Sequence, residues 1–180
     1  MLIALHAFSP TSLIQSLHCD VRWTQQKLQL EYQLVAERAA LNWPAPAANP
    51  QRRMALWEHT CFECFVADPT ATGYTEVNVA PSGDWNCFDF QAYRLGMQAS
   101  SRASLHSMSV KLDGEQQAWI HVELDLPGWS ERADSLQLGL SAVIEDNQGQ
   151  RHYYALRHID GNPDFHHRDT HILTITRGIE

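Results

Sequence analysis

The stretch AWIHVELDL, residues 118–126, carries the pattern that decides the fold. Its apolar residues, among them Ile120 and Val122, fall on every second position, and polar residues such as His121 and Glu123 separate them. Successive side chains of a β-strand point to opposite faces, so a period of two predicts a strand with one face on a core. A helix would instead repeat its apolar residues every three or four positions.

Comparable segments recur along the chain. Period-two spacing is clear in KLQLEYQLV (27–35) and SLQLGLSAVIED (135–146). Seven further short segments are also interpreted as strands, namely 2–8, 61–67, 74–80, 85–90, 105–113, 152–158 and 170–176. The chain is thus predicted to hold about ten strands, and it has no internal repeat that would indicate a propeller or a solenoid.

Turn-forming residues separate the predicted strands. Pro81-Ser82-Gly83-Asp84 lies between two of them, and Asn147-Gln148-Gly149 between two others. The stretch 36–43 is expected to form one or two helical turns. Residues 42–56 contain three prolines and no period, which predicts an exposed loop, because proline fixes the backbone and lacks an amide donor.

A single sheet of so many strands would leave one apolar face in water, so two sheets packed face to face are expected. The length of 180 residues suits one domain spanning 1–180. A chain of this size can bury roughly 70% of its unfolded surface, so its core needs neither a metal nor a disulfide. The fold class is therefore predicted to be all-β, with antiparallel strands in a sandwich.

Charge and hydropathy exclude several classes of protein. The formal net charge is −8 and the basic residues form no run, which argues against a nucleic-acid or anionic-membrane surface. The first ten residues are too short for a signal peptide, and no apolar run approaches the roughly 20 residues of a membrane span. A cytoplasmic location is expected, with the four cysteines as reduced thiols.

Three blocks of the sequence, 56–67, 74–97 and 162–173, resemble the DOMON-like family, within the superfamily of family-9-type carbohydrate-binding modules. In that family a Trp precedes an acidic strand, a second strand carries Tyr-x-Glu-x-Asn, and a Ser/Pro-Gly turn follows. Here these features fall on Trp57, Glu63, Tyr74, Glu76, Asn78, Pro81 and Gly83. The resemblance implies an immunoglobulin-like β-sandwich, and other members bind haem or sugar.

A sugar site needs exposed aromatic rings that pack on C–H patches, beside acids and amides that bond the hydroxyls. Trp57 lies next to Glu58 and His59, and Trp85 lies between Asp84 and Asn86. Either Trp would also suit the packing of a sheet face. The predicted cleft is formed by Trp57, Glu76, Asn78, Trp85 and Arg94, with Asp164 and His166 supporting its rim.

The C-terminal stretch DFHHRDTH, residues 164–171, has three readings: a metal site, a loop bonded to the sandwich, or the rim of a cleft. Adjacent histidines of an extended chain face opposite ways, so His166 and His167 are not expected to chelate one ion. No metal site is predicted. An aspartate beside one of these histidines would raise its pKa.

Two features of the segment 61–67 need explanation. Cys61 and Cys64 lie three apart on a strand and point to opposite faces, so they are expected to be buried thiols and not metal ligands. Glu63 lies between phenylalanines and needs a partner if it is buried, for which Arg94, Arg157 and Tyr74 are candidates.

The predicted function is non-catalytic binding of a small polar ligand, most plausibly a saccharide or cell-wall fragment. The chain has no GxSxG or HExxH motif, and its acids alone do not define a hydrolase. Two alternatives stay open. One is a non-covalent haem-binding or redox module using His or Met as axial ligands, and the other is an interaction domain without a small ligand. The oligomeric state is left open.

Overall fold

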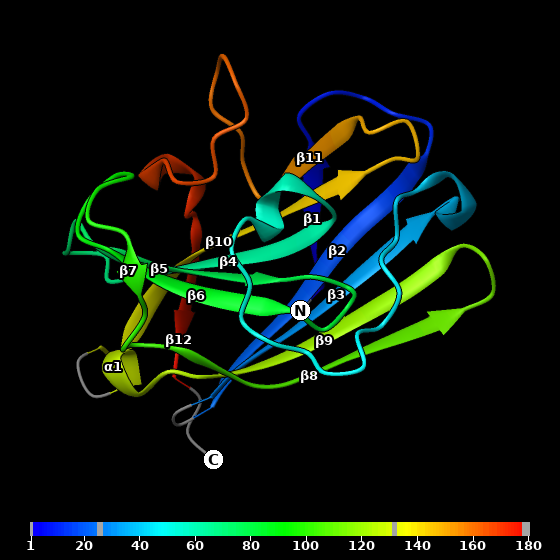
Figure 1. Ribbon diagram of the computed structural model, residues 1–180. Helices are drawn as coiled ribbons and strands as arrows, with labels where there is room; N and C mark the ends of the chain where they lie inside the picture. Colours follow the sequence, from blue (N-terminus) through cyan, green and yellow to red (C-terminus); the bar gives the residue numbers. More distant parts are fainter. Residues whose placement is uncertain (1, 25–26, 131–132, 178–180) are drawn as a thin grey trace.

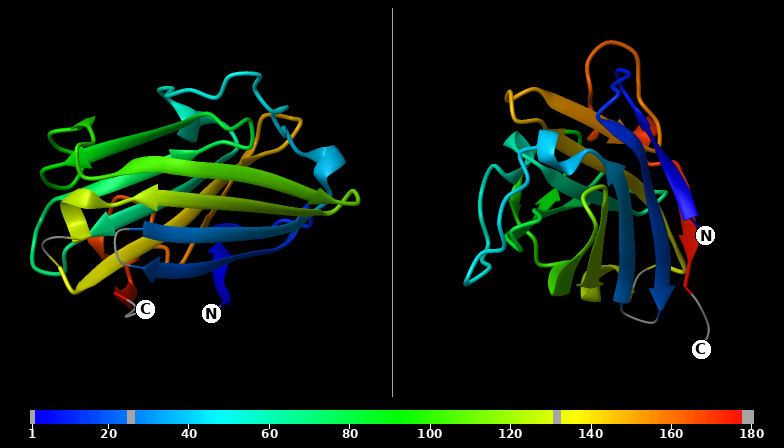
Figure 2. Two further views of the ribbon diagram at one scale, coloured as in Figure 1. Left: turned by 90° about the horizontal axis from the view of Figure 1, so that it is seen from below. Right: turned by 90° about the vertical axis from the view of Figure 1, so that its right-hand side faces the viewer.

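The computed structural model describes residues 2–24, 27–130 and 133–177, and it confirms the prediction of an antiparallel all-β sandwich. Twelve strands are present in the described ranges. The sheet here called sheet A has the order β1 (Leu2–Ala7), β2 (Ile14–Thr24), β3 (Lys27–Ala36), β9 (Gln117–Asp125), β8 (Ser104–Asp113). Figure 2 shows β2, β3, β9 and β8 side by side in one layer.

The sheet here called sheet B forms the second layer. Its order is β7 (Gln98–Ala99), β6 (Trp85–Phe90), β5 (Tyr74–Val79), β4 (Cys61–Ala67), β10 (Ser135–Glu145), β11 (Arg151–Ala155). The last strand, β12 (Leu173–Thr176), pairs with the beginning of β10. Strand β1 joins the layers, because its first residues pair with β2 and its last two with β11.

Short helical turns lie outside the sheets: η1 (Arg38–Ala40), η2 (Leu56–Glu58), α1 (Pro127–Ser130) and η3 (Arg168–Thr170). Residues 42–55 contain no helix or strand, as predicted, and lie along the outside of the molecule (cyan in Figures 1 and 2). The predicted loop differs only at its last residue, since η2 begins at Leu56. Within the described ranges, no helix has the length and apolar character of a membrane-crossing segment.

All ten predicted strands are present, and two strands were not predicted. In β2, alternate residues from Leu17 to Trp23 do point into the core, but the pairing with β3 shifts between Ile14 and Ser16. Such a bulge breaks the period of two at the start of the strand and hides the pattern. Strand β7 has two exposed residues and therefore carries no apolar signal.

The core lies between the two sheets and contains the inward side chains of both. Tyr32 of sheet A is fully buried and packs on Phe62 of sheet B, with 5.2 Å between their ring centroids. The Tyr32 hydroxyl donates a hydrogen bond of 2.7 Å to the backbone carbonyl of Glu63. A polar link inside the core therefore fixes β3 against β4.

This link yields the first prediction. Tyr32→Phe keeps the ring and removes the hydroxyl, so the free energy of unfolding should fall by about 1 kcal/mol, a typical net value for a buried hydrogen bond. Urea unfolding followed by tryptophan fluorescence measures it. Tyr153→Phe is the matched control and should change stability by less. Equal stability of the Tyr32 variant and the parent would contradict a structural role for the hydroxyl.

Candidate functional site

Sheet B is buried on both faces, unlike sheet A. Every residue of β4 and β5 is buried, whereas β3 alternates between buried and half-buried or exposed residues. The outward face of sheet B is covered by η2 and by the segment 156–171, which runs over it from β11 to η3 (orange to red in Figure 1). The candidate site lies beneath these covering segments.

A pocket of about 440 Å³, here called the sheet B pocket, lies on this covered face. Its apolar wall is formed mainly by Trp57, Phe90, Met97, Tyr153 and Phe165. Its polar groups are Glu63, Glu76, Arg94, Arg151 and His166. Aromatic rings beside hydrogen-bonding groups are what a small polar ligand with apolar patches requires.

The structure brings together most of the residues expected from the sequence. Trp57, Glu76, Arg94 and His166 all line the sheet B pocket. Asp164 does not line it but bonds to Arg94 at its edge.

Asn78 and Trp85 do not line the sheet B pocket. Asn78 is buried beside it and donates a hydrogen bond of 2.6 Å to Oε1 of Glu76. Trp85 packs against the core between the sheets, and the guanidinium of Arg52 lies 4.3 Å from its ring centroid. On β6 the even-numbered residues face outward, so the ring of residue 85 points away from the pocket.

The stretch 164–171 bonds the covering segment to the sheet and also rims the pocket, which combines two of its three predicted readings. Asp164 accepts hydrogen bonds from the Tyr93 hydroxyl and, at 2.9 Å, from the Arg94 guanidinium. These bonds hold the pKa of Asp164 below its ordinary value, although burial opposes them. Loop 91–97 is thereby tied to the segment that follows β11.

Tyr74 forms the central contact of this network. Its hydroxyl accepts the backbone N–H of Arg94 at 3.1 Å and lies 2.8 Å from Nδ1 of His166. In the tautomer that carries its hydrogen on Nε2, the imidazole accepts the hydroxyl hydrogen of Tyr74 at Nδ1. Arg94 adopts the left-handed backbone conformation at φ 53°, which is unusual for a residue with a side chain.

His166 and His171 are uncharged near neutral pH. Burial, followed by the nearby charge of Arg94, lowers the pKa of His166 to about 4. Asp164 acts on His166 in the expected direction and raises its pKa, but burial and the charge of Arg94 outweigh this effect, so the net shift is downward. Burial likewise lowers the pKa of His171 to about 4.

His171 fixes the end of the covering segment. Its ring stacks on Phe65 at 5.2 Å, and its Nε2 bonds to the carbonyl of Phe165 at 3.1 Å. The ring also lies against Gly139 of β10, where an added Cβ would come within 2.5 Å of the imidazole. Glycine is needed at this position because the backbone and the ring approach so closely.

Glu63 and Glu76 supply the acidic groups of the pocket. Burial raises the pKa of Glu76 to about 7, and burial together with the neighbouring Glu76 raises that of Glu63 well above its usual range. The hydrogen-bond partner of Glu63 is Ser141, whose Oγ lies 3.3 Å from Oε2. None of the predicted partners bonds to this carboxyl, and the guanidinium of Arg94 is paired with Asp164 instead.

Several lining residues were not expected at the site, notably Phe90, Met97 and Tyr153. Phe90 is the last residue of β6 and lies with Phe88 on the outward face of sheet B. Placing Phe90 in the pocket requires knowing that the loop segments cover this outward face. Cys61 and Cys64 lie in different buried clusters on the two sides of β4, as predicted from their spacing.

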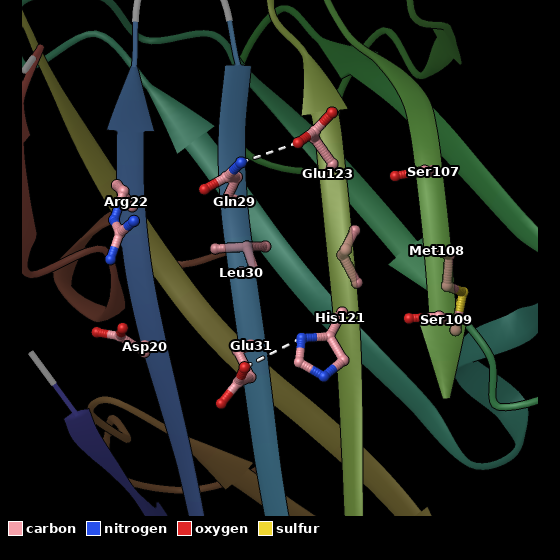
Figure 3. Close-up of a pocket in the computed structure, with 11 residues that line it drawn as sticks. Asp20, Arg22, Gln29, Leu30, Glu31, Ser107, Met108, Ser109, His121 and Glu123 are labelled. Carbon is pink, nitrogen blue, oxygen red and sulfur yellow. Dashed lines mark hydrogen bonds and ion pairs between the residues drawn. The ribbon is translucent and has the colours of Figure 1, made fainter. Parts of the chain in front are cut away.

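A second hollow of similar size, about 440 Å³, lies on the outer face of sheet A (Figure 3). Its polar groups pair with one another: Nδ1 of His121 lies 3.0 Å from Glu31, and Gln29 donates to Glu123 at 2.9 Å. Its lining has no aromatic ring except the imidazole of His121. We favour the sheet B pocket because its carboxyls are buried and aromatic rings line the same hollow.

In the part of the chain that the structure describes, no group of three or more His, Cys, Asp or Glu is arranged to hold a metal ion.

Comparisons with known proteins find similarity in structure and none in sequence. No protein-family model matches the chain, and no curated protein sequence matches it. Among solved structures, a candidate carbohydrate-binding protein from Bacteroides uniformis matches with a TM-score of 0.67 and 14% identity, over 99% of this chain and 86% of that one.

A family 9 carbohydrate-binding module from Caldicellulosiruptor kristjanssonii, solved with cellotriose, matches with a TM-score of 0.65 and 11% identity, over 100% of this chain and 84% of the module. A family 9 module from the same organism, solved with glucose, matches with a TM-score of 0.61 and 12% identity, over 90% and 76% of the two chains. At these identities the similarity establishes a shared fold. It agrees with the β-sandwich fold that the resemblance implied, while membership of the DOMON-like family stays a prediction.

The raised pKa of Glu76 yields the second prediction. Between its ordinary value of 4.5 and about 7, the folded chain holds a proton that the unfolded chain releases, so stability from this residue falls as the pH rises through that window. Glu76→Gln removes the titration. The free energy of unfolding of the variant minus that of the parent should be higher at pH 8 than at pH 4.5. The change in this difference should reach up to about 3 kcal/mol.

Urea unfolding of both proteins at the two pH values measures the effect. Stability differences that are the same at pH 4.5 and pH 8 would show that Glu76 titrates normally in the folded chain.

Proposed function

We propose that this chain is a non-catalytic module that binds a saccharide, such as a cell-wall fragment, in the sheet B pocket. The observation that carries the proposal is the pairing of an aromatic wall with buried carboxyls in one hollow. Aromatic rings offer faces for the C–H patches of a sugar ring, and carboxyls bond its hydroxyls. The fold shared with modules solved with glucose and cellotriose supports the same reading.

Trp57 is the ring best placed to contact a ligand. It is half-buried in η2, lines the pocket, and packs edge-to-face on Phe88 with 6.0 Å between centroids. The contact with Phe88 holds the indole in one orientation before a ligand arrives, which reduces the entropy lost on binding. The rim groups Asp164 and Arg94 fix the loop opposite.

The pocket suits one or two sugar rings and no more. Small contact areas give weak binding, because association entropy consumes much of the gain, so dissociation constants between about 1 µM and 1 mM are expected. Oligomers that place several rings on the protein would need contacts beyond the sheet B pocket.

The haem alternative has one observation in its favour, since Met97 and His166, both suitable axial ligands, line the same pocket. However, Nδ1 of His166 is engaged by Tyr74 at 2.8 Å, and Nε2 lies 3.8 Å from Oε2 of Glu76. An imidazole with both nitrogens beside protein groups is poorly placed to bind iron. Titration with haemin separates the two functions, because haem binding would produce a shifted Soret band.

The third prediction tests the site. Isothermal titration with glucose, cellobiose and cellotriose should show binding of at least one of them to the parent protein. Trp57→Ala should weaken that binding at least five-fold, which corresponds to about 1 kcal/mol, because the stacking face is lost.

Trp85→Ala is the matched control, since its ring lies on the other face of β6 and should not contact the ligand. Circular dichroism and melting temperature confirm that both variants are folded. Loss of binding in Trp85→Ala with no loss in Trp57→Ala would place the site elsewhere.

A further inference from the structure

Two carboxyls face the sheet B pocket without a basic side chain to pair with them. Glu63 and Glu76 are only 3% and 4% exposed, and both line the pocket. Their partners are the Ser141 hydroxyl and the Asn78 amide, each of which bonds a single carboxyl oxygen. Among described residues, neither carboxyl has a lysine or arginine within 4.0 Å. A buried carboxylate without a cation is costly, so each carboxyl either holds a proton, in line with its raised pKa, or pairs with a cation from outside the chain.

The basic groups around the pocket form no ion pair with these carboxyls. The guanidinium of Arg94 lowers the pKa of both carboxyls through its charge, but it is bonded to Asp164 at 2.9 Å, and burial outweighs its effect. Arg151 is exposed on β11 and lies at the edge of the pocket. His166 is uncharged near neutral pH, because burial lowers its pKa to about 4. Within the described residues, protonation is thus the way in which the carboxyl pair loses its charge.

The apolar wall is also suited to a cation. The rings of Trp57, Phe90 and Tyr153 line the same hollow as the carboxyls. Aromatic faces attract ammonium groups through the negative potential of the ring, most strongly where water is excluded. A neutral sugar uses the rings for C–H packing only, whereas an ammonium gains from the rings and from the carboxyls together.

We infer that the ligand carries a protonated amino group, which binds at Glu63 and Glu76, and that the saccharide of the proposed function is therefore an amino sugar. This inference rests on the proposed function and narrows its substrate class. On binding, the ammonium takes the position of the proton that otherwise neutralises the carboxyl pair. Hydroxyls of the same sugar remain for the rim groups Arg94 and Arg151.

Isothermal titration of the parent protein at pH 7 tests the inference with sets of three ligands. Glucosamine, galactosamine and mannosamine are the charged ligands. Each is compared with its parent sugar (glucose, galactose or mannose) and with its N-acetyl derivative, which has the same ring without the charge. At least one amino sugar should bind ten-fold or more tightly than both of its neutral counterparts. Neutral sugars that bind as tightly as every amino sugar would overturn the inference and leave the proposed function standing. Binding of none of the nine would overturn the inference, and if cellobiose and cellotriose also fail to bind, the proposed function is overturned with it.

Charge-removing variants locate the contact. In Glu63→Gln and Glu76→Gln, the ratio of amino-sugar affinity to parent-sugar affinity should fall toward one. Glu31→Gln removes the same charge from the outer face of sheet A and should leave the ratio unchanged. A preference that survives in both pocket variants would overturn the assignment of these carboxyls. If a variant does not fold, the titration of the unmodified protein with the nine ligands still tests the inference.

Discussion

The hydroxyl of Tyr74 is the contact on which the site depends. It receives the backbone N–H of Arg94 from one loop and bonds the imidazole of His166 from another, while its own ring stacks on Phe90 at 4.8 Å. Burial raises the pKa of this phenol to about 12, so it stays protonated and keeps its hydrogen for the imidazole at physiological pH. One side chain of β5 therefore fixes both loops that border the pocket.

The need for such a contact follows from the outward face of sheet B. Phenylalanines and carboxyls alternate there, and a sheet exposed to water would not retain apolar side chains of this size without a cover. The segment 156–171 provides the cover. Its first residue, Leu156, donates its backbone N–H to the carbonyl of Leu140 in β10 at 3.1 Å. Further along, side-chain contacts hold the segment, such as the bond between Tyr74 and His166 and the stacking of His171 on Phe65. Where the cover and the sheet do not fill the space between them, the pocket remains.

Sequence reasoning recovered the strands, the two-layer architecture and part of the site. The period of two in β3 and β9 carried enough information for this, because those strands have one face on the core and one nearer to water. In β10 the first residues alternate in the same way, although the later ones are all buried. In β4, β5 and β6 both faces are buried, and alternation then does not tell which side chains meet a ligand. Trp57 and Glu76 were assigned to the cleft because they match features of the resembled family, and both line the pocket. Trp85 was also assigned to the cleft, but the sequence did not show to which face of the sheet its ring points.

The network around Asp164 was beyond reach for a different reason. Tyr93 and Arg94 lie about seventy residues before Asp164 in the chain. Their contact depends on the path of two loops over the sheet, and loops carry no periodic signal. The net pKa of His166 could not be predicted either, because burial, which the sequence does not reveal at a loop position, outweighs the upward effect of the neighbouring aspartate.

The outermost strand of sheet A has a consequence for solubility. Strand β8 pairs with β9 on one side only, and unpaired backbone groups of an edge strand can recruit another chain into an aggregate. Here the strand has a register shift between Leu105 and Ser107, and it carries exposed His106 and Lys111. An irregular, charged edge is a poor template for intermolecular pairing, so this surface should resist self-association even at high protein concentration.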